Sequence, residues 1–107
     1  EKLTESSKQQ LEEFIKKVVE KKEQEFVDFF NKSDAINKRF HQIELLPGLG
    51  KKHMKGIIKQ RQEKLFESFE DMKKRIPNLP DPKKAIEKRM FKELTQTERY
   101  NLFVKER

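Results

Sequence analysis

The stretch Leu-Pro-Gly-Leu-Gly-Lys-Lys-His-Met-Lys-Gly-Ile-Ile, residues 46–58, decides the fold because it joins a very tight turn to a helix. Gly48 and Gly50 can adopt a positive φ without a Cβ clash, which a turn of this kind requires. Leu49, between them, can place its side chain beneath the turn and fix the turn to a core. Apolar residues then recur at helical spacing, so we expect a helix over residues 51–62.

The same turn is suited to binding phosphate. It leaves peptide N–H groups pointing outward, and the start of the next helix adds free donors and the positive end of its dipole. Lys51, Lys52 and Lys55 place positive charge beside these donors. The stretch resembles the helix-hairpin-helix motif, which contacts nucleic-acid backbones. The candidate nucleic-acid-binding residues are Pro47, Gly48, Leu49, Gly50, Lys51, Lys52, His53, Lys55, Lys59 and Arg61.

A plain connection between two helices is the simplest alternative for this turn, because glycine is common wherever a helix ends. The narrower pattern Leu-Pro-Gly-Leu-Gly, with an apolar residue four positions on, favours the helix-hairpin-helix geometry. That geometry still leaves two functions open, because such modules also serve as protein-docking or purely structural units.

Composition limits the class of protein. At 107 residues the chain has the length of one domain, and its 33% of hydrophobic residues, with nine Phe, suffice for one modest core. The absence of Cys excludes disulfides and thiolate zinc sites and agrees with a cytoplasmic location. No apolar run is long enough to cross a membrane, so we expect no membrane partner. The first residue is Glu, which suggests a piece of a longer protein.

The net charge of +7 is unevenly distributed. Residues 1–35 carry seven Lys and nine acidic residues, a net charge of −2, whereas residues 36–107 carry a net charge of +9. From Leu45 to Gln62 there is no acidic residue, and five of the basic residues fall inside this segment. The concentration of positive charge at the turn favours a polyanionic partner.

Hydrophobic periodicity predicts an all-α fold of five helices. We expect one long helix over residues 6–30, a second from 34 to about 45, and the third over residues 51–62. A fourth helix over residues 69–75 would be capped by Ser68, and a fifth would run from Pro82, capped by Asp81, to about Leu94. Ile36, Phe40, Ile43 and Leu46 would face inward from the second helix, with His41 a hydrogen-bonded structural residue.

Two segments look like copies of one unit. Leu46-Pro47-Gly48-Leu49-Gly50 aligns with Ile76-Pro77-Asn78-Leu79-Pro80, thirty residues later, and the second copy has lost both glycines. We therefore expect a tandem helix-hairpin-helix, one intact and one degenerate, over residues 34–94. The long helix would occupy residues 1–33. Residues 95–107 would form a tail. Its strand-like end lacks a partner within this chain, so we expect residues 97–107 to be poorly ordered or to use a neighbour's contact.

Nearly the whole chain resembles an archaeal family, domain of unknown function 655, whose members are predicted to bind nucleic acid. The resemblance is carried by Arg39-Phe40-His41-Gln42 and by Glu44-Leu45-Leu46-Pro47-Gly48-Leu49-Gly50-Lys51-Lys52-His53-Met54, with further matches as far as Tyr100 and Leu102-Phe103-Val104. Lys55 departs from the pattern, where an aromatic residue is expected, and this weakens a stacking role there. The resemblance implies an OB-fold barrel ahead of these helices and a context of RNA, the ribosome or DNA handling.

The leading hypothesis is a non-catalytic module that holds the phosphate backbone without reading bases. The alternative is a protein-docking module in a ribosomal or transcription assembly. An enzyme such as a glycosylase is poorly supported, because the chain has no Trp, one Tyr and no recognisable catalytic motif. We expect no metal site or cofactor beyond a monovalent cation, K⁺ or Na⁺, which related hairpins hold with the carbonyls of the turn.

Overall fold

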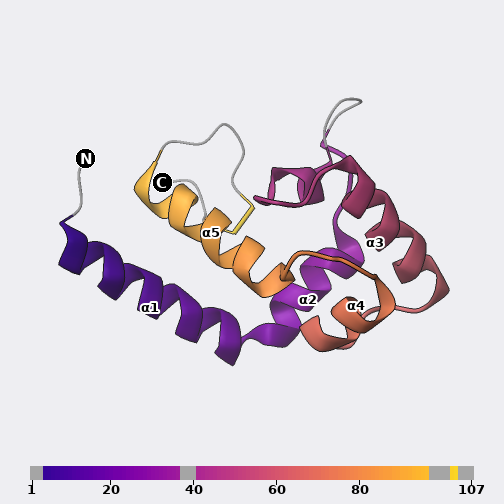
Figure 1. Cartoon of the computed structure of the whole chain (residues 1–107), viewed down its shortest axis with the longest axis horizontal. Coiled ribbons are helices and arrows are strands. Elements are labelled where there is room, and N and C mark those ends of the chain that lie inside the picture. Colours follow the sequence, from indigo (N-terminus) through magenta and orange to yellow (C-terminus); the bar gives the residue numbers. More distant parts are fainter. Residues whose placement is uncertain (1–3, 37–40, 97–101, 104–107) are drawn as a thin grey trace.

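A computed structural model describes residues 4–36, 41–96 and 102–103. Its elements, in chain order, are α1 (Glu5–Lys21), α2 (Glu23–Lys32), the short 3-10 helix η1 (Gln42–Leu45), α3 (Lys51–Glu63), α4 (Phe69–Arg75) and α5 (Pro82–Thr95) (Figure 1). The described residues form five α-helices and no strand beyond an isolated bridge between Ala35 and His41, which confirms the all-α prediction. None of the helices in these ranges is long and apolar enough to span a membrane.

The predicted single helix over residues 6–30 is wrong, because the chain breaks at Lys22 into α1 and α2. Residues 20–25 are all charged or amide side chains, so no buried side chain holds the helix straight across this segment. The break also serves a tertiary contact. Glu23, at the start of α2, accepts a hydrogen bond of 3.0 Å from the backbone N–H of Phe69 at the start of α4.

The helix predicted from 34 to about 45 is also wrong, because residues 34–36 and 41 are not helical and, of the described residues in this segment, only those of η1 are. Asp34 and Gln42 exchange two hydrogen bonds instead, from the N–H of Asp34 to Gln42 Oε1 and from the N–H of Gln42 to the carbonyl of Asp34. These bonds hold residues 34 and 42 together, whereas a helix over the same eight residues would separate them by about 12 Å. Ile43 and Leu46 still face the core, while the inward position predicted for Phe40 lies outside the described residues.

The other three helices lie within one residue of their predicted bounds. Ser68 Oγ accepts a bond from the N–H of Asp71 at the start of α4, and Asp81 Oδ1 accepts one from the N–H of Lys83 at the start of α5. Pro82 occupies the first turn of α5 as expected. These caps are contacts between near neighbours in sequence, which is why the sequence alone could place them.

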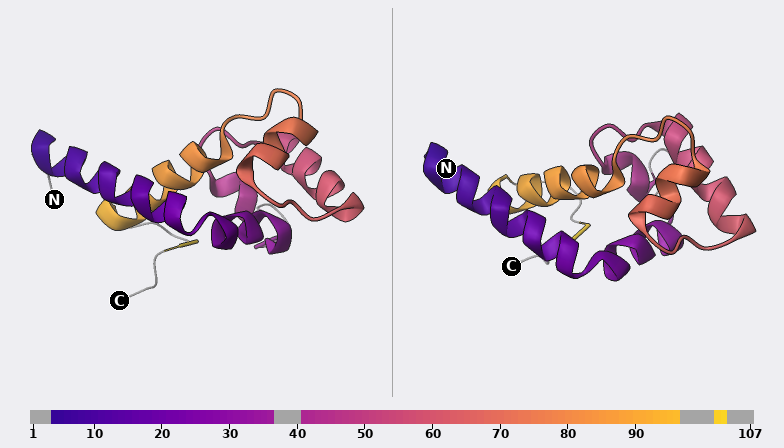
Figure 2. Two further views of the ribbon diagram at one scale, coloured as in Figure 1. Left: turned by 90° about the horizontal axis from the view of Figure 1, so that it is seen from below. Right: turned by 60° about the horizontal axis from the view of Figure 1, so that its bottom comes forward.

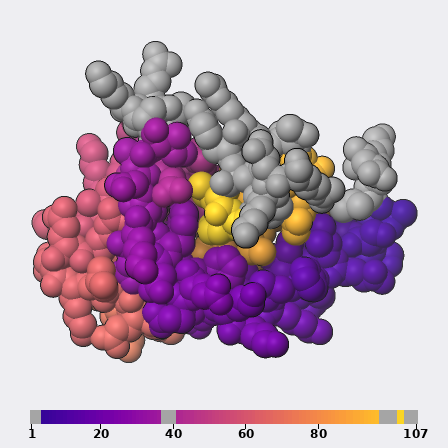
Figure 3. Space-filling model, turned by 180° about the vertical axis from the view of Figure 1, so that it is seen from behind, coloured from indigo at the N-terminus to yellow at the C-terminus, as the bar shows by residue number. Residues whose placement is uncertain are grey.

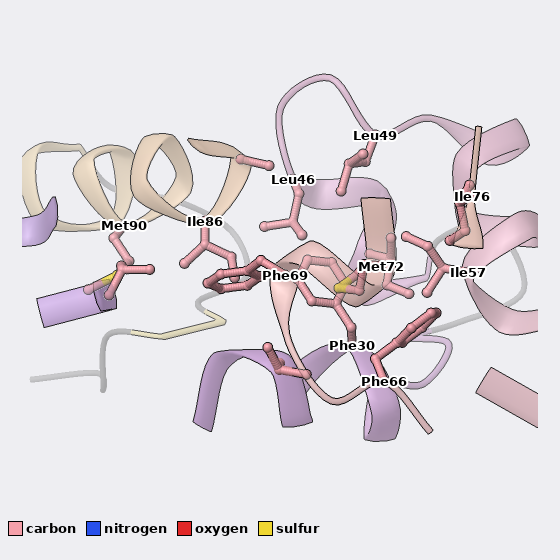
Figure 4. Packing of buried hydrophobic residues seen from close by; sticks show 14 of the residues in the cluster. Phe30, Leu46, Leu49, Ile57, Phe66, Phe69, Met72, Ile76, Ile86 and Met90 are labelled. Carbon is pink, nitrogen blue, oxygen red and sulfur yellow. The ribbon is translucent and has the colours of Figure 1, made fainter. Parts of the chain in front are cut away.

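One hydrophobic cluster joins all the helices (Figure 4). Its fully buried members come from α1 through α5, and the aromatic and aliphatic side chains of α2, α3 and α4 lie close together in the close-up. The cluster consists of Ile15, Val19, Val27, Phe30, Ile43, Leu46, Leu49, Ile57, Phe66, Phe69, Met72, Ile76, Ala85, Ile86 and Met90. Because Leu46, Leu49 and Ile76 belong to it, both predicted turns are fixed to the same core.

Helices α1 and α5 form a pair, and helices α2, α3 and α4 form a group. Helix α5 lies along α1, and the first turns of α1 project beyond it, while α2, α3 and α4 gather at the other end of the molecule (Figures 1 and 2). Glu20 of α1 forms an ion pair of 2.6 Å with Lys83 of α5, which helps hold the pair together. The turns before α3 and α5 therefore sit where the pair meets the group.

The described part of the tail packs against its own chain. Glu93 Oε2 and Oε1 accept hydrogen bonds from the backbone N–H groups of Leu102 and Phe103, at 2.7 and 2.9 Å. The Phe103 ring makes edge contacts with Phe26 and Phe29 of α2. Figure 3 shows Leu102 and Phe103, in yellow, between α2 and α5. At these two residues the prediction of an unpacked, strand-like tail is wrong, and the rest of that prediction lies outside the described residues.

Candidate functional site

The turn before α3 is built as its glycines predicted. The N–H of Leu49 donates to the carbonyl of Leu46 at 3.1 Å, which closes a four-residue turn with Pro47 and Gly48 at its centre. Gly48 has φ +84°, the left-handed conformation that the third position of a type II turn requires. Leu49 is 1% exposed, so its side chain lies beneath the turn and fixes the turn to the core.

Four consecutive peptide N–H groups are available where α3 begins. The capping position is Gly50, which has no side chain to accept from them. The first intrahelical bond in this turn runs from Met54 N–H to the Gly50 carbonyl, and no described residue supplies an acceptor for the N–H groups of residues 50–53. The starts of α1, α4 and α5 are each capped by a side-chain oxygen instead. The N–H of Leu49, one of the candidate binding residues, is used inside the turn.

The predicted lysines follow these donors along α3, with Lys51 and Lys52 in its first turn and Lys55 and Lys59 in later turns. Lys51, Lys52, Lys55 and Lys59 are all exposed, and His53 is half-buried in the first turn of α3. Within the described part of the chain, no carboxylate lies within ion-pairing distance of the four lysines. Elsewhere lysines are paired, with Lys64 bonded to Glu67 at 2.8 Å and Lys73 to Glu70 at 3.0 Å. The positive charge at the start of α3 is therefore not neutralised by neighbouring acids.

Arg61 does not belong with the lysines. Its Nη1 donates to the carbonyl of Phe30 at 3.0 Å and to Ser33 Oγ at 3.3 Å. These acceptors lie at the end of α2, so the guanidinium satisfies a terminal carbonyl of that helix and joins α2 to α3. Arg61 thus has a structural position, in contrast to its predicted role as a phosphate ligand.

The turn before α5 repeats the geometry of the first. The N–H of Leu79 donates to the carbonyl of Ile76 at 3.3 Å, and Asn78 adopts φ +63° where the first turn has Gly48. The two turns are neighbours in space, because a Cβ built on Gly48 would lie 3.9 Å from Pro80 Cβ. The repeat predicted from the sequence is therefore a repeat of backbone structure, with the two copies side by side.

The chemistry of the second turn is different. Pro80 and Pro82 have no N–H, and the side chain of Asp81 accepts the N–H of Lys83. The Lys83 ammonium is held by Glu20 at 2.6 Å and lies 3.8 Å from Glu87. These carboxylates raise the pKa of Lys83, chiefly through the hydrogen bond to Glu20. A negative side chain thus stands where the first turn offers free donors.

Two side chains, those of His41 and Arg75, have structural partners that no sequence motif indicated. His41 Nδ1 accepts a bond of 3.1 Å from the N–H of Ile43 and caps η1, which agrees with the structural role predicted for it. Burial lowers the pKa of His41, and the charge of Arg61 lowers it further. Arg75 donates to the carbonyls of Gln60 and Lys64 at the end of α3 and lies 4.6 Å from the centre of the Phe66 ring. Only the three-dimensional structure shows these partners.

Other surface features are less suited to a ligand. A groove of about 300 Å³ lies between α1 and α5. Its lining mixes both signs of charge, with Glu12, Glu13 and Lys16 from α1 and Lys84, Glu87 and Lys88 from α5. The described residues contain no cluster of three or more His, Cys or acidic side chains that could hold a metal ion. The turn before α3 is the site that combines free donors with unpaired charge.

Fold and site define an all-helical domain with twin turns, of which one exposes donors and lysines. The chain belongs to the family described as Protein of unknown function (DUF655), whose model matches residues 1–105. It is 42% identical over 107 residues to the uncharacterised protein MJ0038 of Methanocaldococcus jannaschii, a match that covers 98% of this chain and 48% of that protein. The chain therefore spans about half the length of this relative.

A solved structure supports the same fold. The chain is similar to the crystal structure of Af1531 from Archaeoglobus fulgidus, described as a DUF655 member, with a TM-score of 0.83 and 41% identity. This match covers 94% of the present chain and 56% of that one. Both relatives come from archaea, as the resemblance in the sequence implied.

Proposed function

We propose that this chain is a non-catalytic nucleic-acid-binding module of the helix-hairpin-helix type. It holds the phosphate backbone at residues 47–52 and does not read bases. The observation that carries the proposal is the coincidence of four free N–H groups at the start of α3 with exposed lysines that have no acidic partner among the described residues. Phosphate oxygens accept from such donors, and lysines add attraction that does not depend on sequence.

One such site touches few phosphates, so binding by this chain is weak. Non-specific contacts of this kind have a Kd on the order of 10⁻⁴ to 10⁻⁶ M at physiological salt. The relatives are about twice as long, which leaves room for a second binding surface. The resemblance implies an OB-fold barrel there, whose groove suits single strands, in a context of RNA, the ribosome or DNA handling.

The test is a titration of labelled DNA and RNA, single-stranded and duplex, at several salt concentrations. We expect binding that weakens steeply with salt, and its loss in the double variant Lys51→Glu with Lys52→Glu. The helix should survive, because acidic side chains are favoured in the first turn. The matched control is Lys84→Glu with Lys88→Glu, which reverses two exposed charges on α5. Equal losses in both variants would show a response to net charge and would refute the site.

Protein docking is the second candidate, and one observation favours it. Phe14 of α1 is 60% exposed, on an open surface that it shares with Gln10 and Lys17. Aromatic side chains are enriched in the contact surfaces between proteins. Association with a ribosomal or transcription protein that tolerates high salt and is lost in Phe14→Ser would support this alternative over nucleic-acid binding.

A further inference from the structure

The exposed lysines of α3 continue away from the turn in a row. Lys51, Lys55 and Lys59 are four residues apart, so each step rises about 6 Å along the helix, and together with Lys52 they lie within about 100° of its circumference. The opposite face carries Ile57, which is fully buried. Figure 1 shows α3 running from the turn toward the far end of the molecule, so the row leads outward from the free N–H groups.

The row is a surface of one sign. No acidic residue occurs between Leu45 and Gln62, and no carboxylate of the described ranges pairs with these lysines. An ordinary solvated helix face carries both signs, as α4 does with its pair of Glu70 and Lys73. The row is about 12 Å long. A stacked strand carries one phosphate charge per ~3.4 Å, and an extended strand carries fewer over the same length, so the row faces about two to four phosphates.

The neighbouring turn offers no equivalent surface for a second strand. Pro80 and Pro82 remove two donors, Asp81 adds a negative charge, and Lys83 is bound to Glu20. A phosphate brought to this turn would meet a carboxylate before it met a free N–H group. The two turns have the same backbone geometry, but the first attracts an anion and the second repels it.

We propose that the module holds one strand only, and that this strand runs from the turn at residues 47–50 along α3 to Lys59. The partner is thus a single-stranded nucleic acid or a single-stranded segment of a longer one. This inference rests on the proposed function and adds to it the class of nucleic acid and the path. Duplex gains nothing from its second strand, because the site that would receive it is closed by Pro80 and Asp81.

The first experiment removes the outer half of the row. Binding of a single strand is measured by fluorescence anisotropy over a salt series, for the 107-residue chain and for Lys55→Gln with Lys59→Gln. Each lost phosphate contact lowers the slope of log Kobs against log salt by about 0.7, so we expect a decrease of about 1.4. The control, Lys84→Gln with Lys88→Gln, removes the same charge from α5 and should leave the slope unchanged. An unchanged slope in the α3 variant, or equal changes in both, would overturn the proposed path.

The second experiment compares substrates. Affinity for single strands should rise with strand length up to about five nucleotides. Beyond that length it should increase only with the number of positions on the strand at which one module can bind. A duplex of equal length should bind no more tightly than the single strand. A preference for duplex of about tenfold or more would overturn the one-strand inference.

The two failures are distinguishable. If Lys51→Glu with Lys52→Glu binds every polyanion like the wild type, the proposed function itself is wrong. If that variant loses binding while Lys55→Gln with Lys59→Gln keeps the wild-type salt slope, the proposed function stands and the strand path is wrong.

Discussion

Replacing Arg61 tests whether this residue stabilises the fold or binds phosphate. Its hydrogen bonds to the end of α2 assign it to the fold. In Arg61→Ala the carbonyl of Phe30 and the hydroxyl of Ser33 lose the guanidinium that bonds them at 3.0 and 3.3 Å. A hydrogen bond to a charged group contributes about 1.5–3 kcal/mol, and the second bond here is long and partly exposed. We therefore expect the free energy of unfolding to fall by about 2 kcal/mol in total.

The expected loss is large enough to measure. For a domain of this size, 1 kcal/mol corresponds to about 4–5 °C in Tm, so Arg61→Ala should melt about 8–10 °C below the wild type. Thermal unfolding followed by circular dichroism gives this shift. At a temperature where the variant is fully folded, its affinity for a single strand and its salt slope should equal those of the wild type.

The matched variant is Lys59→Ala, which removes the same charge from an exposed site two residues away. Its Tm should change by no more than about 2 °C, since exposed positions without partners contribute within ~0.5 kcal/mol. Its salt slope should fall by about 0.7, one phosphate contact on a single strand. If Arg61→Ala kept the wild-type Tm and lost salt slope, Arg61 would be a phosphate ligand and the assignment to the end of α2 would be wrong.

Three further predictions concern the turns, the histidine cap and the tail. Gly48→Ala should lower the free energy of unfolding by about 1–2 kcal/mol in urea, because φ +84° strains any residue with a Cβ. Asn78→Gly, at φ +63°, should not destabilise the protein. Equal losses in the two variants would contradict a left-handed conformation at both positions. Burial lowers the pKa of His41 in the folded state, so its contribution to stability is complete above the unfolded pKa of about 6.5 and is lost as pH falls through the folded value. His41→Asn keeps an acceptor for Ile43 and should flatten stability between about pH 7 and 5; a wild-type pH profile in this variant would assign the titration elsewhere. Phe103→Ala should cost about 2 kcal/mol, because the half-buried ring packs on two Phe rings of α2, and a Tm equal to that of the wild type would show that the tail does not stabilise the fold.

The turns and the last three helices were predictable because their determinants are local. Pro47 and Pro77 fix φ at the second position of each turn, and Gly48 and Asn78 accept a positive φ at the third. Ser68 and Asp81 cap helices through atoms two or three residues away. The row of lysines on α3 follows from helical spacing alone, so the sequence by itself determined the candidate site.

The tertiary structure decided what depends on partners distant in the chain. Glu23, just after the break at Lys22, accepts a hydrogen bond from the N–H of Phe69. Arg61 donates to the carbonyl of Phe30 and does not join the exposed lysines. Glu93 draws the tail residues 102–103 onto the helices. Such bonds join residues that are far apart in the chain, so no spacing pattern in the sequence predicts them. Local sequence therefore set where the chain turns and where charge gathers, while long-range hydrogen bonds set which polar side chains build the fold and which remain available to a ligand.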